Sequence, residues 1–407
     1  MNDRDRRPMN QTTLERLADL LVGFGANVQP GQLVAVSSEL GKEPLTRAIA
    51  ASAYRHGALY VDVSYADPHV RRARIEHGSD EALETVPSWI GQRILALGEQ
   101  RCARVALTGP VAPGLLDDLD PARVGSDRSQ ALREAGQVIN ERTTNWTIGP
   151  CPTPAWAQLV HPDLDPDAAL ATLWEEIVHV CRLDEADPVA AWRERMATLT
   201  SAAERLTAAR FDALHFEGPG TDLTVGLLPS SRWMSAAFST VEDLPHVPNI
   251  PSEEVFTTPD PARTEGVVRS TKPLQLGEAT VRGLSVRFEG GRATAIDADQ
   301  GAETLQAHLA RDEGGARLGE VALVDREGRI GPLGTVFYDT LLDENAASHL
   351  AFGCGFEFAL EDPDDAARSN RSEIHVDFMI GGDDVDVTGI RADGTREPVL
   401  RNGSWAT

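Results

Sequence analysis

The chain has 407 residues, of which 41% are hydrophobic and 25% are charged. This is the composition of a globular protein with room for two domains, and it argues against extended disorder. The 63 acidic and 38 basic residues give a net charge of −25, which repels phosphate backbones and anionic membrane surfaces. We therefore expect neither a nucleic-acid partner nor a membrane partner, whereas cationic ligands and metal ions are compatible with this charge.

The cysteines and the N-terminal segment indicate the compartment. Cys102, Cys151, Cys181 and Cys354 are far apart and include no C-x-x-C pair, which argues against a disulfide framework, a structural zinc site or a thiol redox motif. The charged N-terminal segment is not followed by an apolar signal-peptide core, and no apolar run approaches the ~20 residues that span a bilayer. We expect a cytoplasmic protein.

The first half of the chain alternates between strand and helix patterns. A buried strand is predicted at 32–37 and further strands at 59–65 and 104–108, with a helix at 43–56 between the first two. Strand, helix and strand at this spacing predict a βαβ unit and a mainly parallel sheet. The glycine-rich segments at 23–25 and 218–220 do not complete G-x-G-x-x-G after a strand, so a nucleotide is not expected.

A domain boundary is predicted at Asp187–Pro188, which reads as a helix start with Asp as the N-cap and Pro in the first turn. Alternating strand patterns and hairpin turns then follow, at 223–227, 281–288, 385–390 and 397–400. We predict an α/β N-terminal domain with a mainly parallel sheet at residues 1–187. An α+β, strand-rich C-terminal metal-binding domain is predicted at 188–407.

The most informative segment lies near the C-terminus, where His375 and Asp377 alternate with apolar residues at 374, 376, 378 and 380. This period of two is typical of a strand with one face on a core, so the imidazole and the carboxylate project together from the other face. Both groups are ligands of a type that suits a divalent metal. Taken by itself, the pair is better explained as an exposed polar face.

Three other segments of the second half carry candidate ligands. Glu253 and Glu254 are adjacent, and in an extended chain only one of them can face a given site. Glu320 precedes an apolar strand, and His349 follows the polar cluster 343–345. Each feature also has an ordinary explanation: Glu320 can be a solvated strand end, His349 a hydrogen-bonded core histidine, and the cluster 343–345 a helix cap. Together, three carboxylates and two imidazoles suit zinc, cobalt or manganese better than calcium or magnesium.

These segments are similar to motifs of the thermophilic-type metallo-aminopeptidases, the family of aminopeptidases T, S and II, and the resemblance runs nearly end to end. In the N-terminal half it rests on Pro30-Gly-Gln, Ala53-Tyr54 with Gly57-Ala58, Trp146, Pro152-Thr-Pro-Ala-Trp156-Ala and Asp187-Pro with Trp192. In the C-terminal half it rests on Gly220-Thr-Asp-Leu-Thr-Val-Gly-Leu, Asn249-Ile-Pro-Ser-Glu-Glu-Val-Phe-Thr-Thr-Pro-Asp, Leu318-Gly-Glu-Val-Ala-Leu-Val, Asp343-Glu-Asn-Ala-Ala-Ser-His and Ile374-His-Val-Asp-Phe-Met-Ile-Gly.

The resemblance implies a metal-dependent aminopeptidase that removes N-terminal residues from peptides with a free N-terminus, by a water that two metals activate. It implies two divalent metal ions (zinc, cobalt or manganese) on five ligands: Glu254, Glu320, His349, His375 and Asp377. Glu320 resembles the bridging carboxylate, and the family pattern favours Glu254 over Glu253. The resemblance also implies a homodimer with active sites that face an enclosed cavity.

One position departs from the family pattern, which has a tyrosine near the metals seven residues after the first metal-binding histidine. Phe356 stands there, and a phenyl ring can neither ligate a metal nor donate a hydrogen bond. Tyr338, the one tyrosine of the second half, is a candidate substitute. Glu253 and Glu344 are candidate proton carriers or anchors of the substrate amine.

Two alternatives follow from the same residues. Dihydroxypyridine ring-cleaving dioxygenases look like distant relatives of this chain, and they use one iron(II) held by His, His and Asp. The presence of Glu254 and Glu320 favours the two-metal hydrolase over them. The second alternative is a catalytically impaired homologue whose metals only stabilise the fold, although a structural role is less natural for five ligands than for a closed four-ligand site.

Overall fold

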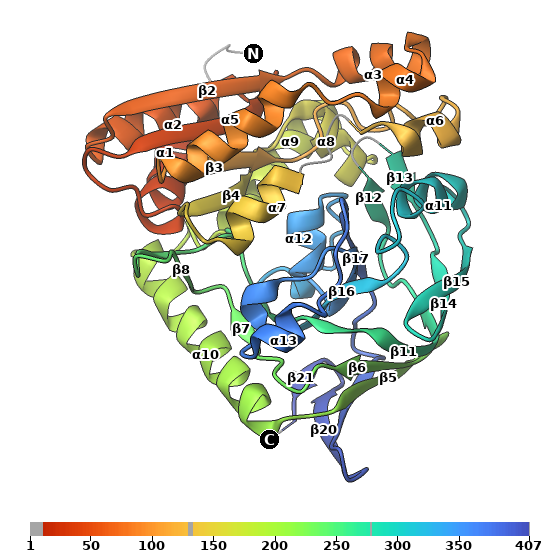
Figure 1. Ribbon diagram of the computed structural model, residues 1–407. Helices are drawn as coiled ribbons and strands as arrows, with labels where there is room; N and C mark the ends of the chain where they lie inside the picture. The colour runs from red at the N-terminus through yellow and green to blue at the C-terminus, as the bar shows by residue number, and fades with distance from the viewer. Residues whose placement is uncertain (1–10, 129–132, 277–278, 407) are drawn as a thin grey trace.

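The computed structural model describes residues 11–128, 133–276 and 279–406. It confirms the predicted fold class: a parallel sheet with helices forms the N-terminal part and antiparallel sheets form most of the rest (Figure 1). Within these ranges no helix combines the length and apolar character needed to cross a membrane.

The N-terminal sheet has the order β2-β1-β3-β4, and its paired strands are parallel. The strands are β1 (Leu33–Glu39), β2 (Tyr60–Ala66), β3 (Ala103–Thr108) and β4 (Trp146–Pro150). The first three match the predicted segments to within two residues. The helices of this part are α1 (Gln11–Asp19), η1 (Leu20–Gly25), α2 (Glu43–Arg55), α3 (Pro68–His77), α4 (Asp80–Glu84), α5 (Ser88–Glu99), α6 (Pro121–Ser126), α7 (Arg133–Asn140), α8 (Pro154–Val160) and α9 (Pro166–Val180).

The long helix α10 (Pro188–Ala209) begins where the sequence predicts, because Asp187 caps it by accepting a hydrogen bond from the Ala190 amide. It runs along one side of the molecule, past both parts (Figure 1). Trp192 of α10 packs in the N-terminal core, whereas Leu199 and Leu206 pack in the C-terminal core. The division at residue 187 stays a prediction, since segments after it, such as Ile250 and Phe337, also pack in the first core.

The C-terminal part contains two larger antiparallel sheets. The five-stranded sheet has the order β18-β17-β16-β10-β7, with β7 (Met234–Ser235), β10 (Glu254–Thr257), β16 (Leu318–Val324), β17 (His349–Gly353) and β18 (His375–Met379). The eight-stranded sheet has the order β15-β14-β11-β6-β5-β19-β20-β21. Its strands are β5 (Ala213–Gly218), β6 (Thr221–Leu227), β11 (Pro259–Arg269), β14 (Ser285–Glu289), β15 (Arg292–Asp297), β19 (Asp386–Ile390), β20 (Arg396–Arg401) and β21 (Ser404–Trp405).

Short elements complete this part. Two small sheets pair β8 (Phe238–Ser239) with β9 (Pro245–His246) and β12 (Leu274–Leu276) with β13 (Ala279–Val281). The remaining helices are α11 (Ala302–Leu309), η2 (Gly331–Leu333), α12 (Thr340–Glu344), η3 (Glu357–Ala359) and α13 (Pro363–Ala366).

One face of the five-stranded sheet packs on the C-terminal core. Residues from four of its strands lie in that core, and one of them, Phe352, stacks on Phe378 of the same sheet and on Phe288 of the eight-stranded sheet. The core residues of the five-stranded sheet are Val255, Leu318, Val321, Leu323, Leu350, Phe352, Val376 and Phe378. Because strand side chains alternate, the intervening residues project from the opposite face.

Candidate metal centre

The face of the five-stranded sheet opposite the core carries all five predicted ligands. In the strand register Glu320 of β16 lies opposite Ala351 of β17, which lies opposite Asp377 of β18. Two residues farther along the same pair of strands, His349 of β17 lies opposite Ala322 of β16. Residues that are directly opposite in neighbouring strands share a face. Glu254 and His375 belong to the same face through their pairing with Val324 and Gly353.

Small residues lie between the ligands on this face. Ala351 separates Glu320 from Asp377, and both Ala351 and Ala322 are fully buried. A methyl group leaves the space above the strand open, so the longer glutamate, aspartate and histidine side chains can converge over it. A large side chain at either alanine would fill the space in which the ligand atoms meet.

The ligand atoms form groups that can each hold a metal ion. Atoms of Glu254, Glu320 and His349 lie within 4.8 Å of one another, and the same limit holds for Glu320, His375 and Asp377. Glu320 belongs to both groups, which is the arrangement that a carboxylate between two ions requires. A third group of this kind consists of Glu344, His349 and Asp377. Four of the five predicted ligands are buried, and His375 is the accessible one.

The hydrogen bonds of the two histidines leave one ring nitrogen of each directed at the carboxylates. Nδ1 of His349 lies 2.9 Å from the Glu344 carbonyl oxygen, and Nδ1 of His375 lies 2.9 Å from the Cys354 carbonyl oxygen. A carbonyl oxygen only accepts, so Nδ1 carries the hydrogen in both rings. Nε2 of each ring therefore faces an oxygen of Glu254 or Glu320 at 3.1 Å, and it is the atom that carries the lone pair when the ring is neutral and free to bind a metal.

The separations within these groups are also those of ligands on a shared cation. The buried Oε2 of Glu254 lies 3.1 Å from Nε2 of His349, and this ion pair is its contact in the metal-free protein. Two ligand atoms on one zinc ion, each about 2.0–2.2 Å from the metal, are about 3.3 Å apart in tetrahedral geometry. The separations of 3.1 Å, 3.1 Å and 3.4 Å in these groups match that value.

The centre also holds a surplus of negative charge. Burial, followed by repulsion from Asp377 and Glu254, raises the pKa of Glu344 well above its ordinary value. Burial alone would lower the pKa of His349, but the Glu254 ion pair and the neighbouring carboxylates outweigh it and raise that pKa to about 10. Both shifts have one cause, the crowding of carboxylates in a buried space. Two divalent cations would neutralise the charge of the four carboxylates Glu254, Glu320, Glu344 and Asp377.

The structure separates the two adjacent glutamates. Glu254 faces the centre, whereas Glu253 is fully buried on the other side of the strand and forms ion pairs with Arg182 and Arg195. Glu253 also accepts a hydrogen bond from the Arg329 amide. It is therefore neither a proton carrier nor an amine anchor at this centre, and that candidate role was wrong. Its partners are residues far away in the sequence, which a pattern of spacing does not identify.

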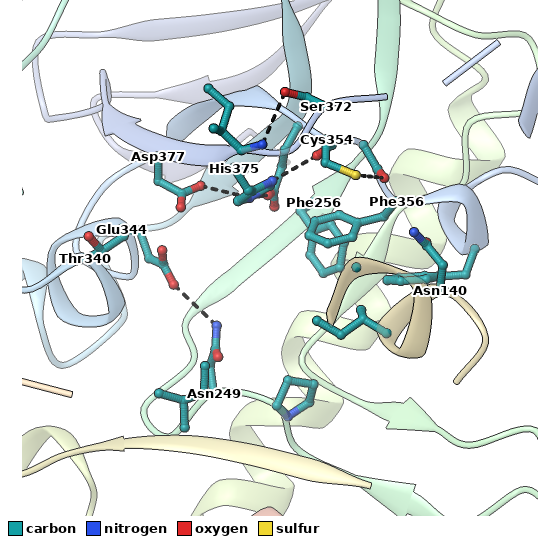
Figure 2. A pocket seen from close by; sticks show the side chains of 18 of the residues that line it. Asn140, Asn249, Phe256, Thr340, Glu344, Cys354, Phe356, Ser372, His375 and Asp377 are labelled. Carbon is teal, nitrogen blue, oxygen red and sulfur yellow. Dashed lines mark hydrogen bonds and ion pairs between the residues drawn. The ribbon is translucent and has the colours of Figure 1, made fainter. Parts of the chain in front are cut away.

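Glu344 lies at the centre, at the end of a helix and not at its start. The cluster 343–345 was a possible helix cap, but α12 is capped by Asp339, whose carboxylate accepts from the Leu342 amide. The Asp339 carboxylate also accepts from the Gly109 amide after β3, so the end of the parallel sheet holds α12 in place. Figure 2 shows Glu344 directed toward Asn249, whose amide donates to it at 3.3 Å.

A cavity of about 1040 Å³ opens onto the centre and is lined by all five predicted ligands and by Glu344. Phe356 is part of its wall, with its ring centroid 5.2 Å from that of His375. Tyr338 does not substitute for a tyrosine at this position, because its ring stacks under Arg282 and its hydroxyl accepts from the same side chain. Phe256 stands beside Phe356 (Figure 2). The sequence signal for Phe256 was its place two residues after Glu254, on the same face of the strand.

Comparison with known proteins agrees with the sequence motifs. The family model described as thermophilic metalloprotease (M29) matches residues 10–405. Aminopeptidase T of Thermus thermophilus is 42% identical over 400 residues, which cover 96% of this chain and 98% of that protein. Aminopeptidase 2 of Geobacillus stearothermophilus is 37% identical, with 97% of each chain covered.

A solved structure of wild-type AmpT from Thermus thermophilus superposes with a TM-score of 0.87 at 40% identity, covering 98% of this chain and 100% of that one. Identity and coverage of this size extend across both parts of the fold. The chain therefore belongs to the thermophilic metalloprotease family M29, a family of metallopeptidases.

Proposed function

We propose that the protein is an aminopeptidase that binds two divalent metal ions and hydrolyses the first peptide bond of peptides with a free N-terminus. The observation that carries this proposal is the shared Glu320. It belongs to two groups of metal-ligand type, with Glu254 and His349 on one side and His375 and Asp377 on the other. Membership of the M29 family and the names of the relatives support the same activity.

Each ligand has a defined role in this proposal. Glu254 and His349 would hold one ion, His375 and Asp377 would hold the other, and Glu320, which belongs to both groups, would be shared between them. When bound, such ions activate a water for attack and polarise the scissile carbonyl. The carbonyl groups of Glu344 and Cys354 fix the two imidazoles with Nε2 directed at the carboxylates of the ligand groups, an arrangement that raises the basicity and the order of metal-binding histidines.

Glu344 is the residue that we assign to the substrate amine. It is a buried carboxylate beside the ligand groups, and the Asn249 amide orients it. An ammonium group is attracted to a buried carboxylate and forms charge-assisted hydrogen bonds with it. Binding of the amine at this position places the first peptide bond at the ligand groups, so an internal peptide bond is excluded by geometry.

Phe356 adds no proton donor to this centre. A tyrosine there would offer a hydroxyl to the oxyanion that forms during attack, and loss of one such donor costs typically 10²–10³ in kcat. We therefore expect turnover in this protein to depend on the metal ions and on Glu344, at a rate below that of a homologue with the tyrosine.

The test uses metal-stripped protein with zinc, cobalt, manganese or iron(II) added back, and peptides with either a free or an acetylated N-terminus. Metal-dependent release of the first residue from the free peptide alone is the expected result. Glu320→Ala is the matched inactive control. Release from acetylated peptides would contradict the role of the amine, and an absence of release with every metal would contradict the proposal.

The ring-cleaving dioxygenase is not favoured, because the relatives named above are all aminopeptidases. It is tested in the same experiment by adding dihydroxypyridine with iron(II) and oxygen. A homodimer, a cytoplasmic location and the identity of the two metals stay predictions. Light scattering and metal analysis of the purified protein address the first and the last of them.

A further inference from the structure

Four phenylalanine rings form one connected wall of the cavity. Phe256 stacks on Phe238 at 6.0 Å and meets Phe356 edge-on at 5.4 Å. Phe358 stacks on Phe356 at 5.3 Å and meets Phe238 edge-on at 5.3 Å. Each ring therefore contacts two of the others. We define these four residues as the aromatic wall, and all of them line the cavity that opens onto the metal centre.

The aromatic wall leaves apolar surface open to this cavity. Seven of the eleven phenylalanines in the sequence are buried: Phe211, Phe216, Phe256, Phe288, Phe337, Phe352 and Phe378. Phe238, Phe356 and Phe358 are only partly buried. Leaving aromatic surface in contact with water costs roughly 25 cal/mol per Å², so a cluster of such rings within a concave site is typical of a binding surface.

The wall is held in place before any ligand binds. The Phe356 amide donates to Oγ1 of Thr258, and that hydroxyl donates in turn to the Phe356 carbonyl oxygen. Arg232 donates to the Phe358 carbonyl oxygen at 3.0 Å. The Glu357 amide donates to Asn140 of α7, which ties the segment to the N-terminal part. Because these hydrogen bonds fix its backbone, the wall is a preformed apolar surface, and a ligand that binds to it does not have to order it first.

The position of the wall identifies what it contacts. Phe356 lies beside His375, while Glu344 lies on the other side of the ligand groups (Figure 2). If Glu344 and the metals hold the amine and the first carbonyl, the side chains that flank the first peptide bond are the substrate groups within reach of the wall. We propose that the aromatic wall is the pocket for the N-terminal side chain, and that it selects large apolar or aromatic residues.

This inference deepens the proposed function and rests on it. An aromatic surface gains from burying apolar area and from edge-to-face or stacked ring contacts. A small residue such as alanine leaves the wall in contact with water, and an acidic residue adds a further negative charge near four carboxylates. Phe356 contributes a fully apolar ring beside His375, where a tyrosine would present a hydroxyl.

The test compares kcat/KM of the metal-loaded protein for tripeptides X-Gly-Gly, in which X is Phe, Leu, Ala, Lys or Glu. We expect Phe and Leu to exceed Ala by at least about 10-fold, the range for loss of apolar pocket contacts. Phe238→Ala should lower the Phe/Ala ratio about 10-fold, and Phe238→Leu serves if the alanine variant does not fold. Trp89→Ala, which removes a ring that is 69% exposed elsewhere, should leave the ratio unchanged.

A second measurement does not depend on turnover. Calorimetric titration of the metal-loaded protein with L-phenylalanine and L-alanine should show tighter binding of phenylalanine, and Phe238→Ala should remove the difference. Equal kcat/KM for all tripeptides, or preference for Lys, would overturn the pocket assignment while the aminopeptidase activity stands. A Phe238→Ala variant that keeps the Phe/Ala ratio would overturn the pocket assignment as well. Hydrolysis of none of the tripeptides would instead remove the proposed function, and this inference with it.

Discussion

The two adjacent glutamates provide a direct test, because the structure gives them opposite roles. Glu253 is fully buried and receives hydrogen bonds from Arg182 at 3.0 Å and from Arg195. Glu253→Gln leaves the two buried guanidinium groups short of a countercharge, and removal of one partner of a buried ion pair costs about 3–5 kcal/mol. We expect this variant to lose that much free energy of unfolding and to keep its affinity for metal.

Glu254→Gln should behave in the opposite way. It removes one ion pair, with His349, and Glu320 and Asp377 remain near that imidazole, whereas Glu253 is paired with two arginines. The metal-free protein should therefore lose less stability than with Glu253→Gln. Loss of a ligand should weaken metal binding more than the 10–100-fold that loss of a ligand's own partner costs.

The assay for this pair is urea unfolding of the metal-free proteins combined with equilibrium dialysis of zinc. The wild-type protein is the reference for both quantities, and the two variants differ from it by the same chemical change at neighbouring positions. If Glu254→Gln binds zinc as tightly as the wild type, or if Glu253→Gln is as stable as the wild type, the assignment of the two side chains to opposite faces is refuted.

Three further predictions concern single residues. Phe356→Tyr should raise kcat by about 10-fold or more without changing the metal content, because it supplies a donor near the oxyanion, whereas an unchanged kcat would show that a hydroxyl there has no role. Glu344→Gln should raise KM for free peptides about 10–150-fold, the equivalent of 1.5–3 kcal/mol for a charged hydrogen bond, while both metals stay bound; an unchanged KM would remove the amine-binding role. Burial raises the pKa of Asp343 from 3.8 to about 6, so the folded state binds its proton more tightly than the unfolded state does. Its contribution is fully present below about pH 4 and is lost as the pH rises through 6, a change of about 3 kcal/mol. Asp343→Asn should therefore lose less stability than the wild type between pH 4 and pH 7 in urea unfolding, and equal losses would contradict the shift.

Local patterns predicted those features that depend on neighbours in sequence. The alternation around His375 and Asp377 predicted a strand with both side chains on one face, and β18 has that form. The Asp187–Pro188 pair predicted the start of α10 for the same reason, since a cap and its helix are adjacent. The resemblance, rather than any pattern, supplied the grouping of five ligands from four separate strands.

Features that depend on distant partners were beyond the sequence. The choice between Glu253 and Glu254 depends on which of them meets Arg182 and Arg195, which lie on α10 and just before it. The direction of Glu344 depends on α12, which Asp339 fixes to the end of the parallel sheet through Gly109. Phe238 joins the aromatic wall from a strand of two residues, too short to produce a pattern. In each case long-range packing decides where the side chain lies.

The measurement that tests the central claim most directly is a titration of metal-stripped protein with zinc, in which bound metal and release of the first residue from Leu-Gly-Gly are followed together. The two-metal account predicts that binding saturates at two ions per chain and that the activity appears with them. It also predicts that Glu320→Gln, which alters the residue shared by both groups, binds neither ion tightly and releases no leucine. Saturation at one ion per chain with full activity, or full activity of Glu320→Gln, would contradict the account.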